Sequence, residues 1–128
     1  MLFKNRMVAG IPEPVIDLMP VYNNVYALTV NGDVYFAKEK DTDNAKLLAS
    51  GITAIADTVY SDCFVSANQK GEVLVYDART QNTKPIKAIA LERGRISELA
   101  VYETSMAVKF VNCGTGYFTL PGGRPHER

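Results

Sequence analysis

The stretch GEVLVYDART, residues 71–80, decides the fold class of this chain. A turn glycine leads into a short run of apolar residues. The run ends at Tyr76, and an acidic, a small, a basic and a hydroxyl residue follow. Four to eight β-branched and aromatic residues bounded by turn residues are typical of a β-strand. If this unit recurs at a fixed interval, the chain has a repeat architecture.

The unit does recur, at intervals of about forty residues. In each copy an apolar segment, a polar turn, a second strand, a glycine turn and a third strand follow one another. The copies are Val15–Phe36, Ile52–Tyr76 and Ile96–Phe118, with turn glycines at positions 32, 71 and 114. A tight turn between antiparallel strands needs a positive φ, which glycine adopts without steric cost. Asn31-Gly32 is the strongest of these hairpin signals.

A further strand-like segment precedes each copy, and we expect it to form the outermost strand of that unit. The three segments are Lys4–Ala9, Ala45–Leu48 and Pro85–Leu91. Residues 121–128 form a polar tail, so we expect the N-terminal segment to complete the last sheet, either in its own chain or in a second copy. The sequence therefore predicts one all-β domain over residues 1–120, with units at about 4–36, 45–76 and 85–120.

The middle unit resembles the end of a WD40 repeat, where a glycine turn leads into a strand that ends in Trp or Tyr and then Asp. The resemblance covers Ile52–Thr80 and continues through residues 84–101, the start of the next repeat. It implies a β-propeller, in which each repeat corresponds to a four-stranded blade.

The number of units decides between two architectures. Propellers have about four to eight blades, so three units cannot close a ring. Two copies would supply six blades, and two-fold symmetry is the commonest way to build such an assembly. We therefore expect half of a six-bladed β-propeller that is completed by homodimerisation. The alternative is a β-trefoil monomer, which also has three repeats of this length and which one chain closes.

The residue types that carry catalysis are few and poorly placed. The single histidine, His126, lies in the polar tail, and Cys63 and Cys113 fall at different positions of the repeat. This pattern is not that of a zinc site, and the chain has no nucleophile-elbow, phosphate-loop or dinucleotide motif. We expect no catalytic residue, no metal and no cofactor, and a propeller hydrolase or lyase is the least favoured function.

Charge and hydropathy restrict the partners. The chain has 14 basic and 14 acidic residues and a formal net charge of zero, so it lacks the positive field of a non-specific nucleic-acid binder. It also lacks an apolar run long enough to cross a membrane or to act as a signal segment. We therefore expect a cytoplasmic protein with a protein partner, and neither a membrane nor a nucleic acid as partner.

The resemblance implies that the glycine turns and the turns that lead into each unit lie on one face and dock a partner there. The candidate binding residues on that face are Arg93, Arg95, Lys70, Asn31 and Asn112. Arginine suits such a surface because its planar fork pairs with carboxylates. A β-trefoil would instead bind a carbohydrate or another small ligand. Tyr22, Tyr60 and Tyr102 recur at one repeat position, and we expect them to pack in the core or between units.

Overall fold

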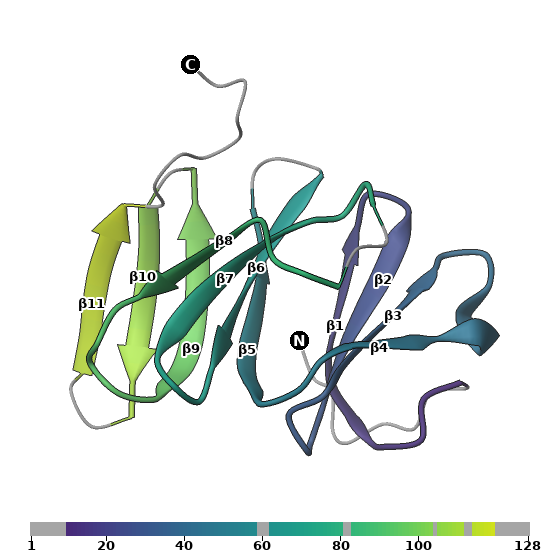
Figure 1. The fold of residues 1–128 in the computed structure, drawn as a ribbon, viewed down its shortest axis with the longest axis horizontal. Helices are drawn as coiled ribbons and strands as arrows, with labels where there is room; N and C mark the ends of the chain where they lie inside the picture. The colour runs from purple at the N-terminus through teal and green to yellow at the C-terminus, as the bar shows by residue number, and fades with distance from the viewer. Residues whose placement is uncertain (1–9, 59–61, 81–82, 104, 112–113, 120–128) are drawn as a thin grey trace.

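Three antiparallel sheets lie in a row in the computed structural model, which describes residues 10–58, 62–80, 83–103, 105–111 and 114–119 (Figure 1). The first sheet has the order β1 (Val15–Val21), β2 (Asn24–Thr29), β3 (Val34–Lys38) and β4 (Lys46–Ala49). The second has the order β5 (Ile52–Asp57), β6 (Cys63–Asn68), β7 (Glu72–Asp77) and β8 (Lys87–Ala90). The third consists of β9 (Ile96–Tyr102), β10 (Ser105–Phe110) and β11 (Gly114–Thr119).

The all-β prediction is confirmed. The part of the chain that the structure describes has no α-helix, and its single 3-10 turn, η1 (Thr42–Asn44), is three residues long. All three turn glycines have a positive φ, of +82° at Gly32 and Gly71 and +76° at Gly114. The hairpins therefore turn where the sequence predicted.

The grouping of the outer strands differs from the expected one. β4 pairs with β3, and β8 pairs with β7, so each outer strand belongs to the sheet that precedes it in the chain. The sequence pattern predicts instead that these segments belong to the units that follow them. Strands that are consecutive in sequence readily pair as antiparallel neighbours, and a repeat pattern does not show on which side of a segment its partner lies. The first segment, Lys4–Ala9, and the tail, residues 121–128, lie outside the described residues.

The β-trefoil alternative is wrong. In a trefoil the strands of three repeats share one barrel, whereas the ladders of the described strands stay within three separate sheets. The innermost strand of the middle sheet, β5, contacts both β1 and β9, so the three inner strands lie next to one another. This is the arrangement of successive propeller blades around a common axis.

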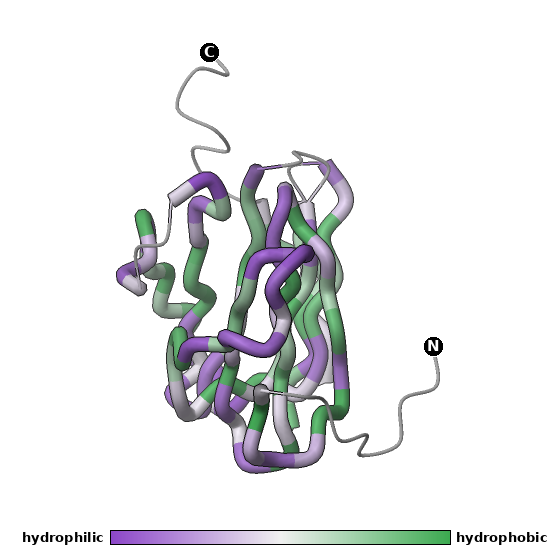
Figure 2. Tube along the Cα trace, turned by 90° about the vertical axis from the view of Figure 1, so that its right-hand side faces the viewer, coloured by the Kyte–Doolittle hydropathy of each residue, from purple (hydrophilic) through white to green (hydrophobic). Residues whose placement is uncertain are grey.

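The middle sheet is buried on both faces. Phe64 and Tyr76 face the first sheet, whereas Val65 and Val75 face the third. This alternation follows from the two-residue period of a strand, and burial of both faces explains why the segments read as almost continuous apolar runs. Figure 2 shows the hydrophobic segments along the strands and hydrophilic ones at many of the turns.

The stretch that follows Tyr76 joins the first two sheets. The Tyr76 ring stacks on Phe64 with 5.0 Å between centroids, and Phe64 lies 4.2 Å from Tyr26 of the first sheet. Beyond it, the buried Asn24 amide donates a 2.8 Å hydrogen bond to the Ala78 carbonyl. The Arg79 backbone N–H donates to the Asp77 carboxylate at 2.9 Å, which turns the chain away from the sheet.

The expectation for the recurring tyrosines is wrong for the two that the structure describes. Tyr22 and Tyr102 are 51% and 72% exposed and do not pack between sheets. Tyr22 lies in the turn between β1 and β2, with a φ of +60°. Tyr60 lies outside the described residues.

Candidate interaction surface

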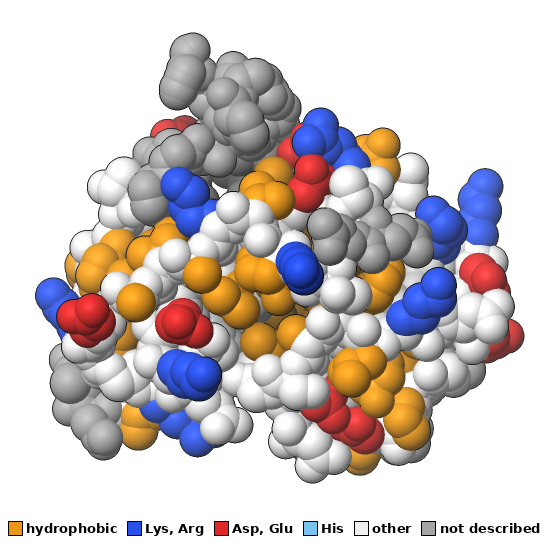
Figure 3. Space-filling model, in the orientation of Figure 1, with side chains coloured by type: hydrophobic (Ala, Val, Ile, Leu, Met, Phe, Trp, Pro, Cys, Tyr) orange, Lys and Arg blue, Asp and Glu red, His pale blue; other side chains and the backbone are white. Residues whose placement is uncertain are grey.

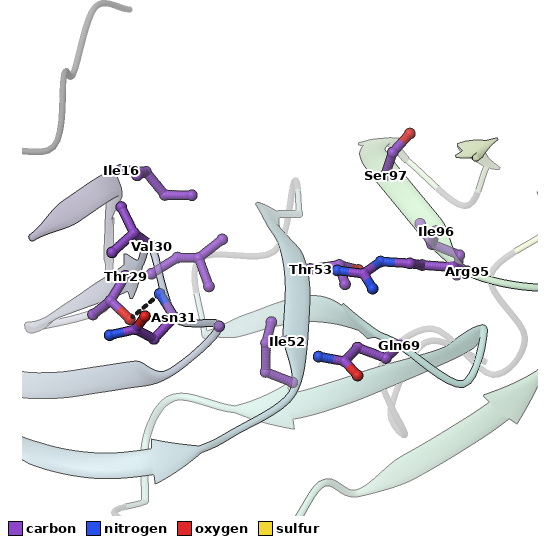
Figure 4. Close-up of a pocket in the computed structure, with 12 residues that line it drawn as sticks. Ile16, Thr29, Val30, Asn31, Ile52, Thr53, Gln69, Arg95, Ile96 and Ser97 are labelled. Carbon is purple, nitrogen blue, oxygen red and sulfur yellow. Dashed lines mark hydrogen bonds between the residues drawn. The ribbon is translucent and has the colours of Figure 1, made fainter. Parts of the chain in front are cut away.

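A pocket of about 460 Å³ lies where the first residues of the three inner strands meet the hairpin turns (Figure 4). We call it the inner-strand pocket. All three sheets contribute to its lining, which consists of Ile16, Leu28, Thr29, Val30, Asn31, Gly32, Ile52, Thr53, Gln69, Arg95, Ile96 and Ser97. A concave site built by several elements around an axis is a usual place for ligand binding.

A β-bulge recurs at the same position of each inner strand. The pairing register skips Ile16 in β1, Thr53 in β5 and Ser97 in β9, and all three residues line the pocket. The Thr53 and Ser97 hydroxyls donate to carbonyls of the neighbouring strand, at 3.3 and 3.2 Å. Bulges re-aim side chains and are common beside functional sites, so the repeated bulge places one side chain from each sheet at the pocket.

The sequence contains a signal for these bulges. The first strand of each unit spaces its apolar residues by three positions, as in Ile52 and Ile55 or Ile96 and Leu99. A regular strand would space them by two. Both members of each pair nevertheless lie in one core cluster, which requires one extra residue between them.

The same kind of side-chain hydrogen bonding stabilises the glycine turns at Gly32 and Gly71. The Thr29 hydroxyl accepts hydrogen bonds from the backbone N–H groups of Asn31 and Asp33, both at 3.2 Å. At the equivalent position, the Asn68 side-chain oxygen accepts from the N–H groups of Lys70 and Glu72, both at 3.0 Å. Short polar side chains stabilise turns in this way, and the result is that Asn31 and Lys70 occupy equivalent turn tips.

Glu13 fixes the rim of the pocket beside the first turn. Its carboxylate accepts hydrogen bonds from the Thr29 hydroxyl at 2.6 Å, the Tyr35 hydroxyl at 3.1 Å and the Asn31 amide at 3.3 Å. These donors, the Thr29 hydroxyl above all, lower the pKa of Glu13, although desolvation opposes them. The carboxylate therefore stays ionised and engaged, and it holds the turn that carries Asn31.

Arg95 gives the pocket its charge, because no other lining residue is ionisable. Its guanidinium points toward Thr53 of β5, and Gln69 lies between it and Ile52 (Figure 4). Asn31 lies on the opposite side of the pocket. The polar side chains are thus a guanidinium, two amides and hydroxyls. This set of hydrogen-bond donors with one positive charge suits a carboxylate-bearing ligand.

The structure brings some of the predicted residues together and separates others. Asn31 and Arg95 line the same pocket, and Lys70 is exposed beside Gln69 at the next turn tip. The guanidinium of Arg93 lies over the rings of Phe118 and Phe110 in the third sheet, 5.2 and 6.0 Å from their centroids. Arg93 therefore packs on the third sheet, where a cation–π contact contributes to local stability.

Asn112 lies outside the described residues. The sequence reasoning missed Thr53, Gln69 and Ser97, which line the pocket.

Within the described ranges, no group of three or more His, Cys, Asp or Glu side chains is placed to hold a metal ion. Over the same ranges there is no helix with the length and apolar character needed to cross a membrane.

No protein-family model matches this chain, and no curated protein matches it significantly. Solved structures do match. A chain of the mitotic checkpoint complex aligns with a TM-score of 0.69 and 14% identity, over 93% of this chain and 39% of that one. Sqt1 of Saccharomyces cerevisiae aligns with a TM-score of 0.63 and 16% identity, over 90% of this chain and 34% of that one.

The β-propeller domain of Cps50 (Swd1) from Myceliophteria thermophila aligns with a TM-score of 0.59 and 14% identity, over 84% of this chain and 39% of that one. The chain thus spans less than two thirds of the length of each of these three structures. All three are WD40 β-propeller proteins. The present chain therefore has the fold of a partial WD40-like β-propeller, made of three consecutive blade-like sheets.

Proposed function

We propose that this chain is a non-catalytic protein-interaction module of the WD40-like type. Two copies close a six-bladed ring, and the face that carries the inner-strand pocket binds a protein partner. The observation that carries the proposal is the pocket itself, to which all three sheets contribute. The solved structures that resemble this chain share its propeller fold, and this supports the proposed ring.

The partly covered face of the first sheet supports the ring. Ile52 and Ile55 of β5 pack against the preceding sheet, as Ile96 and Leu99 of β9 do in turn. Val15 and Leu18 of β1 hold the equivalent positions. In the described residues no sheet precedes the first one. Val15 is buried beside Ile11 and Ala27, whereas Leu18 and Tyr35 are only partly buried, so another sheet would complete the cover of this apolar face. An apolar face that stays partly exposed is typical of an association site.

The charge of the surface supports a protein partner. Basic and acidic side chains are interspersed over the face seen in Figure 3, which shows no extended basic field. Within the pocket Arg95 stands alone as a charge. A single arginine on a rigid turn, flanked by amides, matches an acidic side chain of a partner better than a phosphate backbone.

The mass in solution tests the ring. The expected mass is about 28 kDa, twice the 14.1 kDa chain, because six blades close a propeller and three do not. We expect Leu18→Glu to reduce the mass to that of one chain, since it puts a charge on the apolar face. Ile86→Glu is the matched control, because Ile86 is 51% exposed beside β8 and should leave the mass unchanged. A monomeric wild-type chain would contradict the ring.

Charge reversal at Arg95 tests the binding face. Wild-type chain and the variants Arg95→Glu and Lys40→Glu would each be immobilised and used to capture partners from a lysate, with identification by mass spectrometry. We expect the partner to be retained by the wild type and by Lys40→Glu, whose exposed lysine is not part of the pocket lining. Arg95→Glu should lose it. Equal retention by all three chains would exclude the pocket as the binding site.

A further inference from the structure

The backbone around the inner-strand pocket repeats from sheet to sheet. In each sheet, the N–H of the residue after the second strand donates a hydrogen bond to the carbonyl of the residue before the inner strand. The donor and acceptor residues are Val30 and Pro14, Gln69 and Gly51, and Val111 and Arg95, at 3.0, 3.0 and 2.9 Å. The three sheets thus hold equivalent backbone positions beside the pocket, and the side chains at these positions decide what each sheet offers to a ligand.

The first sheet offers an apolar wall. Ile16, at the bulge of β1, and Val30, after β2, both line the pocket, and they are 40% and 45% exposed. Both lie on the side of the pocket opposite Arg95 (Figure 4). Single exposed aliphatic residues are common on protein surfaces. Two that meet at one concave site form a place where the aliphatic side chain of a ligand can leave water.

The second sheet offers neutral hydrogen-bonding groups at the equivalent positions. Thr53 holds the bulge position and Gln69 holds the position after β6. The Thr53 hydroxyl donates to the Ala67 carbonyl and keeps its lone pairs for a further donor, and the Gln69 amide can both donate and accept. This combination matches the N–H and C=O groups of a peptide backbone.

The third sheet offers a positive charge. Arg95 is exposed and holds the position before β9, and no residue that lines the pocket is acidic. Among the described residues, no ion pair neutralises its guanidinium. A guanidinium without a counter-charge pairs strongly with a carboxylate, which it can bind through two parallel hydrogen bonds.

We propose that the inner-strand pocket binds a short segment of a protein partner in which a large aliphatic side chain and an Asp or Glu side chain are near neighbours. The aliphatic side chain lies against Ile16 and Val30, and the carboxylate pairs with Arg95. The peptide groups between them meet Thr53 and Gln69. This proposal rests on the proposed function, because that function places the partner at this pocket. The volume of about 460 Å³ is within the range of ligand pockets, about 300–1,000 Å³.

Capped peptides test the chemistry of the ligand. The probes are acetylated and amidated at their ends and carry Leu and Asp among Gly and Ala residues. Leu and Asp are adjacent or separated by one or two residues, which places their Cα atoms about 4–10 Å apart in an extended chain. One control series replaces Leu with Ser, and another replaces Asp with Asn.

A titration of the wild-type chain, followed by its backbone amide chemical shifts, reports where each peptide binds and how tightly. We expect at least one probe to shift the amides of Val30, Thr53 and Gln69. The same probe should bind about tenfold more tightly than its two control peptides, because each control lacks one of the two groups that the pocket recognises.

Matched variants assign each group of the ligand to its wall. Arg95→Gln should weaken binding of the probe about tenfold and leave the Asn peptide unaffected, because only the probe carries the carboxylate. Val30→Ser should weaken the probe about fivefold and leave the Ser peptide unaffected. Lys40→Gln and Ile86→Ser are the controls, since both residues are exposed and are not part of the pocket lining. Each control should change the affinity by less than about twofold.

The possible outcomes separate this proposal from the proposed function. Absence of binding by every probe, or equal binding of the control peptides, overturns the ligand assignment. If Arg95→Glu still loses the partner captured from a lysate, the proposed function stands. A monomeric wild-type chain that binds the probe with these dependences overturns the ring and supports the ligand assignment, because one chain supplies the whole pocket lining.

A further peptide distinguishes an acidic side chain from a chain end. It ends in Leu with a free terminal carboxylate and contains no Asp. We expect it to bind more weakly than the best probe. Tighter binding than every probe would overturn the proposal, because it would show that the pocket takes the end of a chain.

Discussion

Gly71 lies where the turn between β6 and β7 meets the connection into the third sheet. Its φ is +82°, and its N–H donates a 3.1 Å hydrogen bond to the Asn68 carbonyl. A Cβ at this position would collide with the carbonyl oxygen of Gly94. The residue therefore combines a left-handed conformation with a close approach of two backbone segments, and both need the absence of a side chain.

We expect Gly71→Ala to destabilise the protein more than Gly51→Ala does. Gly51 also has a positive φ, +71°, but nothing lies within 4 Å of the Cβ that would be added. Gly51→Ala should therefore cost only the left-handed conformation, about 1 kcal/mol. The collision at Gly71 should add about 2 kcal/mol. Denaturant unfolding of both variants measures this difference, and equal costs would show that Gly94 moves away freely.

Glu13 makes the stability of the first turn depend on pH. Its pKa is lowered from an ordinary value of 4.5, chiefly by the Thr29 hydroxyl. A group with a lowered pKa in the folded state contributes stability above its unfolded pKa and loses that contribution as the pH falls through the folded value. The wild type should therefore lose its advantage over Glu13→Gln below pH 4.5 and keep it at neutral pH.

Unfolding free energies of the two proteins across this pH range test the prediction. Tyr35→Phe, which removes one hydrogen-bond donor and keeps the carboxylate, should show a smaller pH-dependent change than the wild type. A constant difference between wild type and Glu13→Gln down to pH 3 would contradict the assignment.

At the scale of elements, the contact between the first two sheets includes a buried side-chain hydrogen bond beside an aromatic cluster. Asn24 is 3% exposed, and its amide donates to the Ala78 carbonyl and to the Tyr26 hydroxyl, at 2.8 and 3.2 Å. Asn24 and Ala78 are 54 positions apart in the chain. This bond orients the sheets relative to each other, because an amide must point at its acceptor whereas ring packing tolerates small shifts.

We expect Asn24→Ala to destabilise the protein by about 1–3 kcal/mol, because it leaves the Ala78 carbonyl without its partner in a buried place. Asn44→Ala is the matched control. Asn44 also donates to a side chain, the Asp41 carboxylate at 2.9 Å, but it does so on the surface. The control should change the unfolding free energy by about 0.5 kcal/mol or less. Equal effects in thermal unfolding would mean that the Asn24–Ala78 hydrogen bond contributes little to the contact between the two sheets.

At the scale of the whole molecule, an incomplete set of blades makes the folding stability depend on protein concentration. In the described residues no fourth sheet covers the partly buried Leu18 and Tyr35 of the first sheet. If a second copy covers them, folding and association are linked, and mass action makes the melting temperature depend on protein concentration.

We therefore expect the melting temperature to fall on dilution of the wild-type chain. Leu18→Glu should melt at a lower temperature that is independent of concentration, because it is expected to remain a single chain. Differential scanning fluorimetry over a hundredfold dilution series makes this measurement. A wild-type melting temperature that does not change with dilution would exclude the linked association.

The sequence by itself determined the strands, the glycine turns and the three-fold repeat. These features depend on interactions within a few residues, such as the two-residue alternation of a strand and the positive φ of Gly32. The resemblance of the middle unit to a WD40 repeat then led to the propeller architecture. Of the candidate binding residues, Asn31 and Arg95 proved to line one pocket.

Only the tertiary structure decided which sheet each outer strand joins and where the bulges place Thr53 and Ser97. It also decided that Arg93 packs on Phe118 and that Tyr22 is exposed. Each of these depends on groups that are far apart in the chain and meet only after the sheets stack. A local pattern cannot specify such contacts, because the same alternation is satisfied whichever neighbouring sheet covers a given face.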